Sequence, residues 1–444
     1  GAHIGNLTDL EIAIERDEPF FTEEKFSYKI NSPRQTVQHH LAKLKTSYFH
    51  DKHSLKLTFA TQINQRKEFD VRRNGRSDIP ALSLLLVSNY IDVAYQYKRE
   101  KFTIKTGLQA TFEDNSNNPE TGILPLIPDY DQAKTGLYLI FERYFNRGWF
   151  EIGTRYDYRH TKAYTITTTL PRDIEILKEN YHDYAFIGSL SFEPNYIYST
   201  QLTLGIIKRS PAINELYSFG LHQGVSGIEK GNTELKPEQA FKILWMQQIN
   251  FKQKYFLEVS PYVQLINEYI YLEPQDELEL TIRGDFPVFE YKSTNAILAG
   301  IDVSTNIEIV PNLNWNIQYE MVRGIDVVNN WPLVYIPADN INSEIKYQFK
   351  PLNKLEGLYL GINGKYVFEQ KKFEETLDFL IPPKGYFVMG LNIGSEVILE
   401  KIDLNWFFSA ENLLNTTYRD YLNRLRYYAD EEGVNLRVGL GIKF

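Results

Sequence analysis

Single residues alternate between apolar and polar along much of this chain. In the last nine residues, 436–444, every second side chain is apolar, from Leu436 to the terminal Phe444, and the residues between them are Arg, Gly, Gly and Lys. The same rhythm runs through 55–64, 91–98, 102–113, 150–159, 301–309 and 402–409. Because successive side chains of a β-strand point to opposite faces, each segment is predicted to be a strand with one apolar and one polar face.

The segments that join these predicted strands are alternately short and long. Short links fall at 50–53, 99–100, 146–148, 193–195, 251–254, 311–312, 351–355 and 400–401. Long polar or Gly- and Pro-containing stretches fall at 72–88, 114–134, 161–181, 210–237, 273–287, 324–340, 371–384 and 415–433. Outer-membrane barrels have short periplasmic turns and longer extracellular loops. The alternation therefore predicts an all-β, antiparallel transmembrane β-barrel with a periplasmic C-terminus.

This pattern predicts about seventeen strands, with boundaries placed to within a few residues. They are centred near 37–50, 53–69, 88–98, 101–113, 135–145, 149–160, 182–193, 196–208, 238–250, 254–271, 288–309, 313–323, 341–350, 356–370, 385–398, 401–413 and 434–444. We expect a single barrel domain over 1–444, in which 1–30 is an extracellular loop entering the first strand and 31–444 holds the strands. Because bacterial single-chain barrels use even strand numbers, the odd count predicts further strands before residue 1.

Composition narrows the class further. Cysteine is absent, so no disulfide, thiolate metal site or cysteine nucleophile is available. The 31 Tyr and 27 Phe suit the aromatic girdles of a membrane barrel. The longest apolar run, 81–87, is far shorter than the roughly 18 residues of a spanning helix. A net charge of -9 argues against a nucleic-acid partner. The first residues lack a signal-peptide pattern, so we expect a mature or truncated start.

Two segments carry motifs beyond strand periodicity. The first is Lys-Arg-Ser-Pro-Ala-Ile-Asn-Glu-Leu-Tyr at 208–217, followed by Gly-Asn at 231–232 and Leu-Lys-Pro-Glu at 235–238. The second is Glu-Asn-Leu-Leu-Asn at 411–415, which leads through Tyr418 to the last strand. Both resemble TonB-dependent outer-membrane receptors. The signature residues are Arg209, Pro211, Glu215, Leu216, Tyr217, Gly231, Asn232, Leu235, Glu238 and Phe444. A strand end, a Pro stop and a Gly-Asn turn explain most of them equally well.

The opening segment 3–10, with Pro-Arg-Gln at 33–35 and His-His-Leu at 39–41, resembles the siderophore-receptor branch common in Bacteroidetes. The resemblance implies a 22-stranded barrel in the outer membrane of a Gram-negative bacterium, surrounded by lipid and occluded by an N-terminal plug that engages TonB. Neither plug nor TonB segment is visible here, so about five strands and the plug are expected to be missing. Phe444 resembles the terminal signal read by the barrel-assembly machinery.

By the same resemblance, the expected function is energy-coupled import of a scarce, bulky solute, most often a ferric siderophore, with no enzymatic activity and no resident cofactor. Loop aromatics and cations are the candidate ligand contacts: Tyr217, Phe219, His222, Tyr418, Arg419, Arg424, Arg426, Tyr427 and Tyr428. Girdle aromatics and solvated loop charges explain each one singly. Other possible functions are a passive porin-like channel, a surface adhesin, and a receptor for haem, zinc or another nutrient.

Metal binding and catalysis have weaker sequence support. The histidines at 39, 40, 50 and 53, with Asp51, are of residue types that bind zinc or iron, but 50–53 is a predicted periplasmic turn where polar residues are expected anyway. We therefore predict no metal site. Asp157, His160 and Ser199 are of catalytic residue types, yet nothing in their spacing requires catalysis, and no phosphate-loop, zinc-protease or nucleophile-elbow motif occurs.

Overall fold

The computed structural model describes residues 7–16, 18–19, 28–72, 75–167, 170–281, 284–352, 354–399 and 402–443. Seventeen long strands form the wall: β1 (Arg34–His50), β2 (His53–Phe69), β3 (Leu82–Lys98), β4 (Phe102–Asn117), β5 (Asp129–Phe145), β6 (Gly148–Ile166), β7 (Ile174–Phe192), β8 (Tyr198–Arg209), β11 (Glu238–Phe251), β12 (Tyr255–Thr281), β13 (Gly284–Val310), β14 (Leu313–Asp326), β16 (Asn340–Gln348), β17 (Leu355–Val367), β18 (Tyr386–Ile398), β19 (Asp403–Glu411) and β20 (Asn435–Lys443). The described part also holds short strands β9 (Phe219–His222), β10 (Gly227–Lys230) and β15 (Trp331–Pro332), and helices α1 (Leu7–Glu15) and α2 (Ile213–Tyr217).

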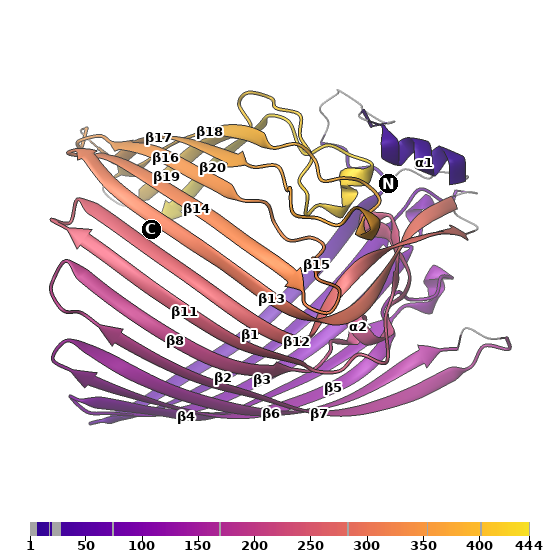
Figure 1. Cartoon of the computed structure of the whole chain (residues 1–444), viewed down its shortest axis with the longest axis horizontal. Helices are drawn as coiled ribbons and strands as arrows, with labels where there is room; N and C mark the ends of the chain where they lie inside the picture. Colours follow the sequence, from indigo (N-terminus) through magenta and orange to yellow (C-terminus); the bar gives the residue numbers. More distant parts are fainter. Residues whose placement is uncertain are drawn as a thin grey trace.

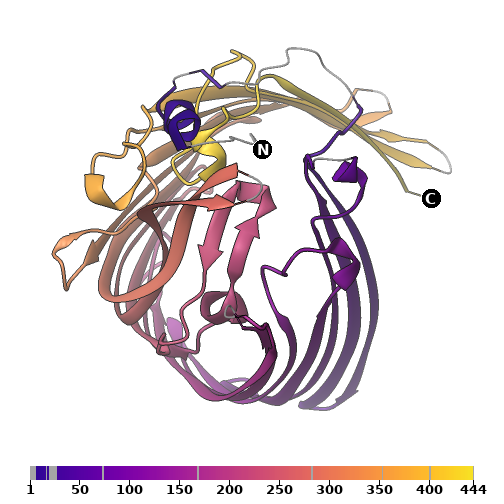
Figure 2. The same ribbon diagram turned by 90° about the vertical axis from the view of Figure 1, so that its right-hand side faces the viewer.

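Each long strand pairs antiparallel with the next long strand along the chain, and the wall curves round on itself (Figures 1 and 2). β8 pairs with β11 because β9 and β10 leave the wall between them, and β14 pairs with β16. The predicted all-β class and the antiparallel pairing of the long strands are confirmed. Among the described residues no pairing joins β1 to β20, so the structure shows a curved twenty-stranded sheet rather than a closed barrel.

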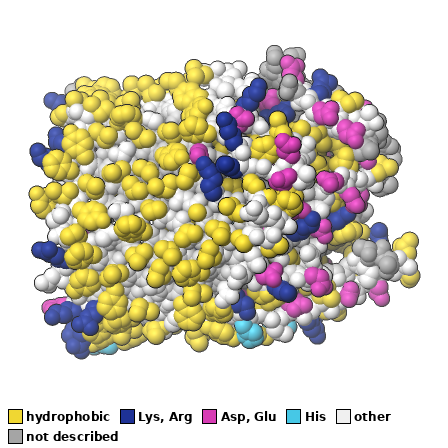
Figure 3. Space-filling model, viewed as in Figure 1, with side chains coloured by type: hydrophobic (Ala, Val, Ile, Leu, Met, Phe, Trp, Pro, Cys, Tyr) yellow, Lys and Arg dark blue, Asp and Glu magenta, His cyan; other side chains and the backbone are white. Residues whose placement is uncertain are grey.

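The outer face of the wall is apolar. Leu137 and Ile152 each expose 59% of their surface, and Phe186 and Leu190 each expose 52%. Figure 3 shows such side chains as a broad hydrophobic band, with charged residues gathered beyond it at the end that holds α1. A water-soluble protein would bury these side chains, whereas lipid-facing strands must display them. No helix in the described ranges is long and apolar enough to cross a membrane.

The two ends of the wall differ, as the link lengths predict. Short turns close one end, while long segments and α1 lie at the other, on the right in Figure 1. Several strands run further toward the long-link end than predicted: β3 begins at Leu82, β7 at Ile174, and β12 and β13 continue to Thr281 and Gly284. At about 3.3 Å per residue these strands are longer than the hydrocarbon core requires, so they project beyond it.

Several predicted loops contain strand residues, which corrects the sequence interpretation. The stretch 273–287 forms the ends of β12 and β13, 210–237 contains β9 and β10, and 324–340 contains β15. In addition, β10 pairs with β13 in the parallel sense, so the sheet is not wholly antiparallel. Elements of two or four residues are too short to give a periodic signal, and β10 gains its pairing from a segment nearly sixty residues away.

Candidate functional site

The first motif builds a corner at the end of β8. The Arg209 guanidinium donates from Nε to Glu238 Oε2 over 2.6 Å and from Nη1 to Glu215 Oε2 over 2.9 Å. Glu215 Oε2 also accepts the Ala212 N–H, at 2.6 Å, which caps α2. Pro211 is fully buried beside them. One cation thus connects the strand end, the short helix and the start of β11.

Gly231 and Asn232 close this corner from the other side. The Gly231 N–H donates to the Ser218 carbonyl at 2.6 Å, and the Asn232 N–H donates to the Glu215 carbonyl at 2.8 Å. A Cβ at Gly231 would lie 2.6 Å from the backbone carbon and oxygen of Leu216. Leu216 itself is buried with Leu235 and Ile270. The signature residues described by the structure therefore hold a backbone corner together; Phe444 lies outside the described residues.

A small sheet extends from this corner across the mouth of the wall. β9 and β10 form a hairpin, and β10 continues the sheet onto the projecting part of β13 (Figure 2). The pairing of β12 with β13 shifts register between Pro274 and Leu278 and between Ile266 and Tyr269. Such bulges bend a hairpin, which lets it lean over the opening. Ile228, Phe286 and Val288 form the buried core of this layer.

A charged cluster fixes this hairpin to the 415–433 segment. Glu229 Oε1 accepts from His222 Nδ1 at 2.8 Å and from Arg424 Nη1 at 2.7 Å. Burial favours the protonated carboxyl, but the bonds from His222 and Arg424 outweigh it and lower the pKa of Glu229. The Arg424 guanidinium also lies over the Phe289 ring, 5.4 Å from its centroid. Two of the predicted ligand contacts therefore bind the same carboxylate.

A second buried cluster lies beside it. The 3-10 helix η5 (Arg424–Tyr427) presents Arg426, 2% exposed, and Tyr427, 1% exposed. Arg426 forms an ion pair with Asp378, and the Tyr427 hydroxyl donates to the other oxygen of that carboxylate at 2.5 Å. The Tyr335 and Tyr427 hydroxyls lie 3.0 Å apart. Burial raises the pKa of Tyr427 well above its ordinary value, so its hydroxyl stays neutral and donates.

Helix α1 packs against this cluster. Its residues Leu10, Ala13 and Ile14 are buried against Phe289 and Tyr427. Their spacing of three and four places them on one face of a helix, which explains why this short apolar stretch folds as one. Segments from six parts of the chain thus meet at the mouth, and only the fold brings them together.

Four more of the residues predicted to contact a ligand have partners within the protein. Tyr418 stacks on Tyr386 with ring centroids 4.2 Å apart, and Arg419 Nε donates to Asp430 at 2.8 Å. The Tyr428 hydroxyl lies 3.4 Å from the Ser226 carbonyl. Tyr217 packs beside the buried corner, and burial raises its pKa to about 12.

Of the nine candidate contacts, only Phe219 is exposed, at 47%. His222 and Arg424 lie together, as do Arg426 and Tyr427, whereas Tyr418 and Arg419 bind other partners. The role of all nine in binding a solute stays a prediction.

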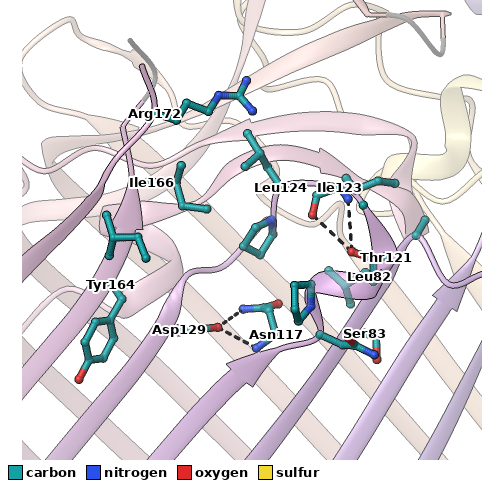
Figure 4. Close-up of a pocket in the computed structure, with 16 residues that line it drawn as sticks. Leu82, Ser83, Asn117, Thr121, Ile123, Leu124, Asp129, Tyr164, Ile166 and Arg172 are labelled. Atoms are coloured by element: carbon teal, nitrogen blue, oxygen red, sulfur yellow. Dashed lines mark hydrogen bonds between the residues drawn. The ribbon is translucent and has the colours of Figure 1, made fainter. Parts of the chain in front are cut away.

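A pocket of about 350 Å³ lies where the extended ends of β3 to β7 meet the 118–128 segment (Figure 4). Apolar side chains of Ile123, Leu124, Tyr164 and Ile166 line it, with Arg172 on one side. Asp129 Oδ1 fixes the turn by accepting from the Asn117 backbone and side chain at 2.7 and 2.8 Å. This segment also supports the hairpin, because the Phe219 N–H donates to the Leu126 carbonyl at 2.9 Å.

Sequence reasoning missed these pocket residues. The signal that could have found them is a cluster of apolar residues, 123–127, inside a segment predicted to be an external loop.

The residues of catalytic types, and His53 among those of metal-binding types, each bind a different partner. Asp157 receives two bonds from Arg155 at 2.6 Å, His160 Nδ1 lies 2.9 Å from the Asn180 side-chain oxygen, and Ser199 donates to Gln248 at 3.1 Å. His53 Nδ1 lies 2.6 Å from the Tyr95 hydroxyl. Within the described ranges no three His, Asp or Glu side chains come together in a way that would hold a metal ion.

Comparison with known proteins identifies the family to which this chain belongs. The family described as "TonB dependent receptor-like, beta-barrel" matches residues 13–413. Among solved structures, the chain is similar to "Copper transporter OprC" with a TM-score of 0.69 at 14% identity, covering 90% of this chain and 64% of that one. It is also similar to the FrpB iron transporter from Neisseria meningitidis, with a TM-score of 0.64 at 14% identity and coverage of 92% and 65%.

The ferric-catecholate import receptor Fiu from E. coli K12 is similar at a TM-score of 0.64 and 13% identity, with coverage of 92% and 64%. No curated protein matches the chain. At these identities the structural likeness shows the fold, and the chain spans just under two thirds of the length of these three structures. The family match covers most of the sequence, so the chain belongs to the β-barrel family of TonB-dependent receptors.

Proposed function

We propose that this chain forms most of the barrel of an outer-membrane importer that is driven through TonB, and that its cargo is a bulky metal chelate, most simply a ferric siderophore. The observation that carries the proposal is the folded layer over the mouth, in which β9 and β10 pair with the projecting part of β13. A passive pore conducts through an open mouth, whereas a gated importer needs a structured surface on which to capture its solute.

The chemistry of the mouth supports a chelate as cargo. The pocket beside the 118–128 segment combines apolar and aromatic walls with the Arg172 cation. An aromatic, anionic chelate would bury its rings against Leu124 and Tyr164 and place negative charge near Arg172. Phe219 adds an exposed aromatic ring on the hairpin that the pocket segment supports. Under this proposal a plug and about five further strands complete the receptor and close the wall.

Uptake by living cells tests the proposal. A strain lacking the gene, complemented with the whole receptor, would be supplied with radioactive iron as a catecholate or hydroxamate complex. We expect uptake in the complemented strain, none above background in the deletion strain, and loss of uptake when TonB is also deleted. Uptake that persists without TonB would identify a passive channel instead, and uptake of neither complex would refute the siderophore assignment.

A further inference from the structure

A basic pocket of about 620 Å³ lies where β14, β17 and the 371–384 segment meet. Its charged lining residues are Arg323, Asp339, Glu369, Lys371, Lys372 and Lys384. Four cations therefore face two carboxylates. Neither the mouth cluster nor the solute pocket includes any of these six residues.

The pocket opens on the lipid-facing side of the wall. Along β14, Ile325 is 44% exposed, and Arg323, two residues before it, shares its face. On β17 and just beyond its end, Tyr366 and Phe368 are 42% and 39% exposed, with ring centroids 4.8 Å apart in an edge-to-face contact. Aromatic rings of this kind mark the interface between hydrocarbon and headgroups.

The height of the pocket also fits the headgroup region. Arg323 follows Leu313, the first residue of β14 at the short-turn end, by ten residues. At about 3.3 Å per residue and a tilt of about 40°, Arg323 stands about 25 Å above that end, which equals the height of the apolar band of such barrels. Figure 3 shows Lys and Arg side chains beside an acidic one at the border of the hydrophobic band on this face.

The lysines are available to a ligand, while hydrogen bonds hold Arg323 and the backbone beside the lysines in place. The Arg323 guanidinium donates two hydrogen bonds to the Asp339 carboxylate, of 2.5 and 2.8 Å. In the described part of the chain, no ion pair involves Lys371, Lys372 or Lys384, and all three are exposed. Buried Gln370 donates to the Ile336 carbonyl at 2.8 Å and accepts the Lys372 N–H at 2.9 Å, which fixes the backbone that carries two of the lysines.

We propose that this pocket binds the phosphate of an anionic lipid headgroup in the outer leaflet. Lys371, Lys372 and Lys384 supply the positive charge, and Tyr366 and Phe368 contact the lipid below the headgroup. Lysine ammonium groups bind phosphate as point charges, and basic pockets at a membrane surface recognise lipid headgroups. This inference rests on the proposed position of the wall in a membrane, but it does not depend on the cargo.

Lipid binding to the whole receptor, extracted in detergent from a bacterial outer membrane, tests the proposal. The probes are lipid A carrying two phosphates, the same lipid after phosphatase treatment, and inorganic phosphate, each measured by native mass spectrometry. We expect wild-type protein to prefer the phosphorylated lipid over both other probes. Removing one lysine should weaken binding about fivefold, and K371Q/K372Q/K384Q together about a hundredfold.

Two further variants make the test specific. K52Q/K98Q/K252Q removes three exposed lysines at the short-turn end and should leave binding unchanged. Asp339→Asn removes a carboxylate and releases the Arg323 guanidinium, so it should tighten binding about fivefold, a gain that misfolding would not produce.

The proposal is refuted if the two triple variants lose lipid equally, if phosphate removal from the lipid has no effect, or if inorganic phosphate competes as well as the lipid. Radioactive-iron uptake measured on the same strains separates these results from failure of the import proposal.

Discussion

The buried pair of Arg426 and Asp378 gives the sharpest test of how the mouth is held together. Replacing Asp378 with Leu leaves a guanidinium that is 2% exposed without its counter-ion. Arginine cannot lose its proton in a protein, so the local stability of the mouth should fall by about 3 to 5 kcal/mol. Replacing Arg426 with Met should lower the local stability of the mouth by a smaller amount. Burial already raises the pKa of Asp378 against the opposing effect of Arg426 and Tyr427, so the orphaned carboxyl can take up a proton.

Hydrogen exchange of the receptor in detergent would measure this difference. The Arg426, Tyr428 and Ala429 amides donate to backbone carbonyls inside the cluster, so they report its opening. In D378L their exchange should accelerate roughly a hundredfold to several thousandfold, because about 1.4 kcal/mol corresponds to a factor of ten. R426M should accelerate exchange less, and more strongly as the pH rises and the carboxyl ionises.

The double variant D378L/R426M is the control, because it removes both charges. Its exchange should return close to the wild-type rate, since paired apolar residues replace a buried ion pair at little cost. Equal acceleration in the two single variants, or no recovery in the double variant, would refute the reasoning.

Three further predictions concern the same mouth. Gly231→Ala should lower local stability by about 1 to 3 kcal/mol through its backbone clash, seen as faster protease cleavage, whereas Gly224→Ala meets only ordinary contacts and should not. Folding lowers the pKa of Glu229 from its ordinary value of 4.5. The ionised carboxylate therefore contributes its full stabilisation at pH values above 4.5, and this stabilisation is lost as the pH falls through the lowered pKa of the folded protein. Hydrogen exchange in β9 and β10 should accordingly rise only under acid conditions. Arg172→Ala should raise the half-saturating concentration for chelate uptake about tenfold at unchanged surface level, while Leu124→Ala should act similarly; unchanged uptake would remove this pocket from the cargo path.

The wall could be predicted because its signal is local. Lipid outside and water inside impose a period of two on each strand, so 436–444 alone indicates a strand and the repeated pattern indicates the sheet. The motifs at 208–238 and 411–415 resembled the family whose model matches the chain. The strand ends were placed less well, because the end of β12 and the start of β13 do not alternate between buried and exposed residues, so this stretch looked like a loop.

The mouth could not be predicted because its contacts join distant segments. Arg426 and Tyr427 are a cation and an aromatic in a polar loop, which the sequence presents as ligand contacts, yet they are buried against Asp378, some fifty residues away. Arg424 and Glu229 are 195 residues apart and meet only because the hairpin leans over the opening.

The sequence by itself determined the seventeen long strands apart from their ends, which face of each of them is apolar, and at which end the long links gather. These follow from a two-residue period that every segment carries without help from the rest of the chain. Only the tertiary structure decided which loop residues are buried, that β10 joins β13, and where the two pockets lie. Those features depend on the curvature of the wall, which brings together segments that no local pattern relates.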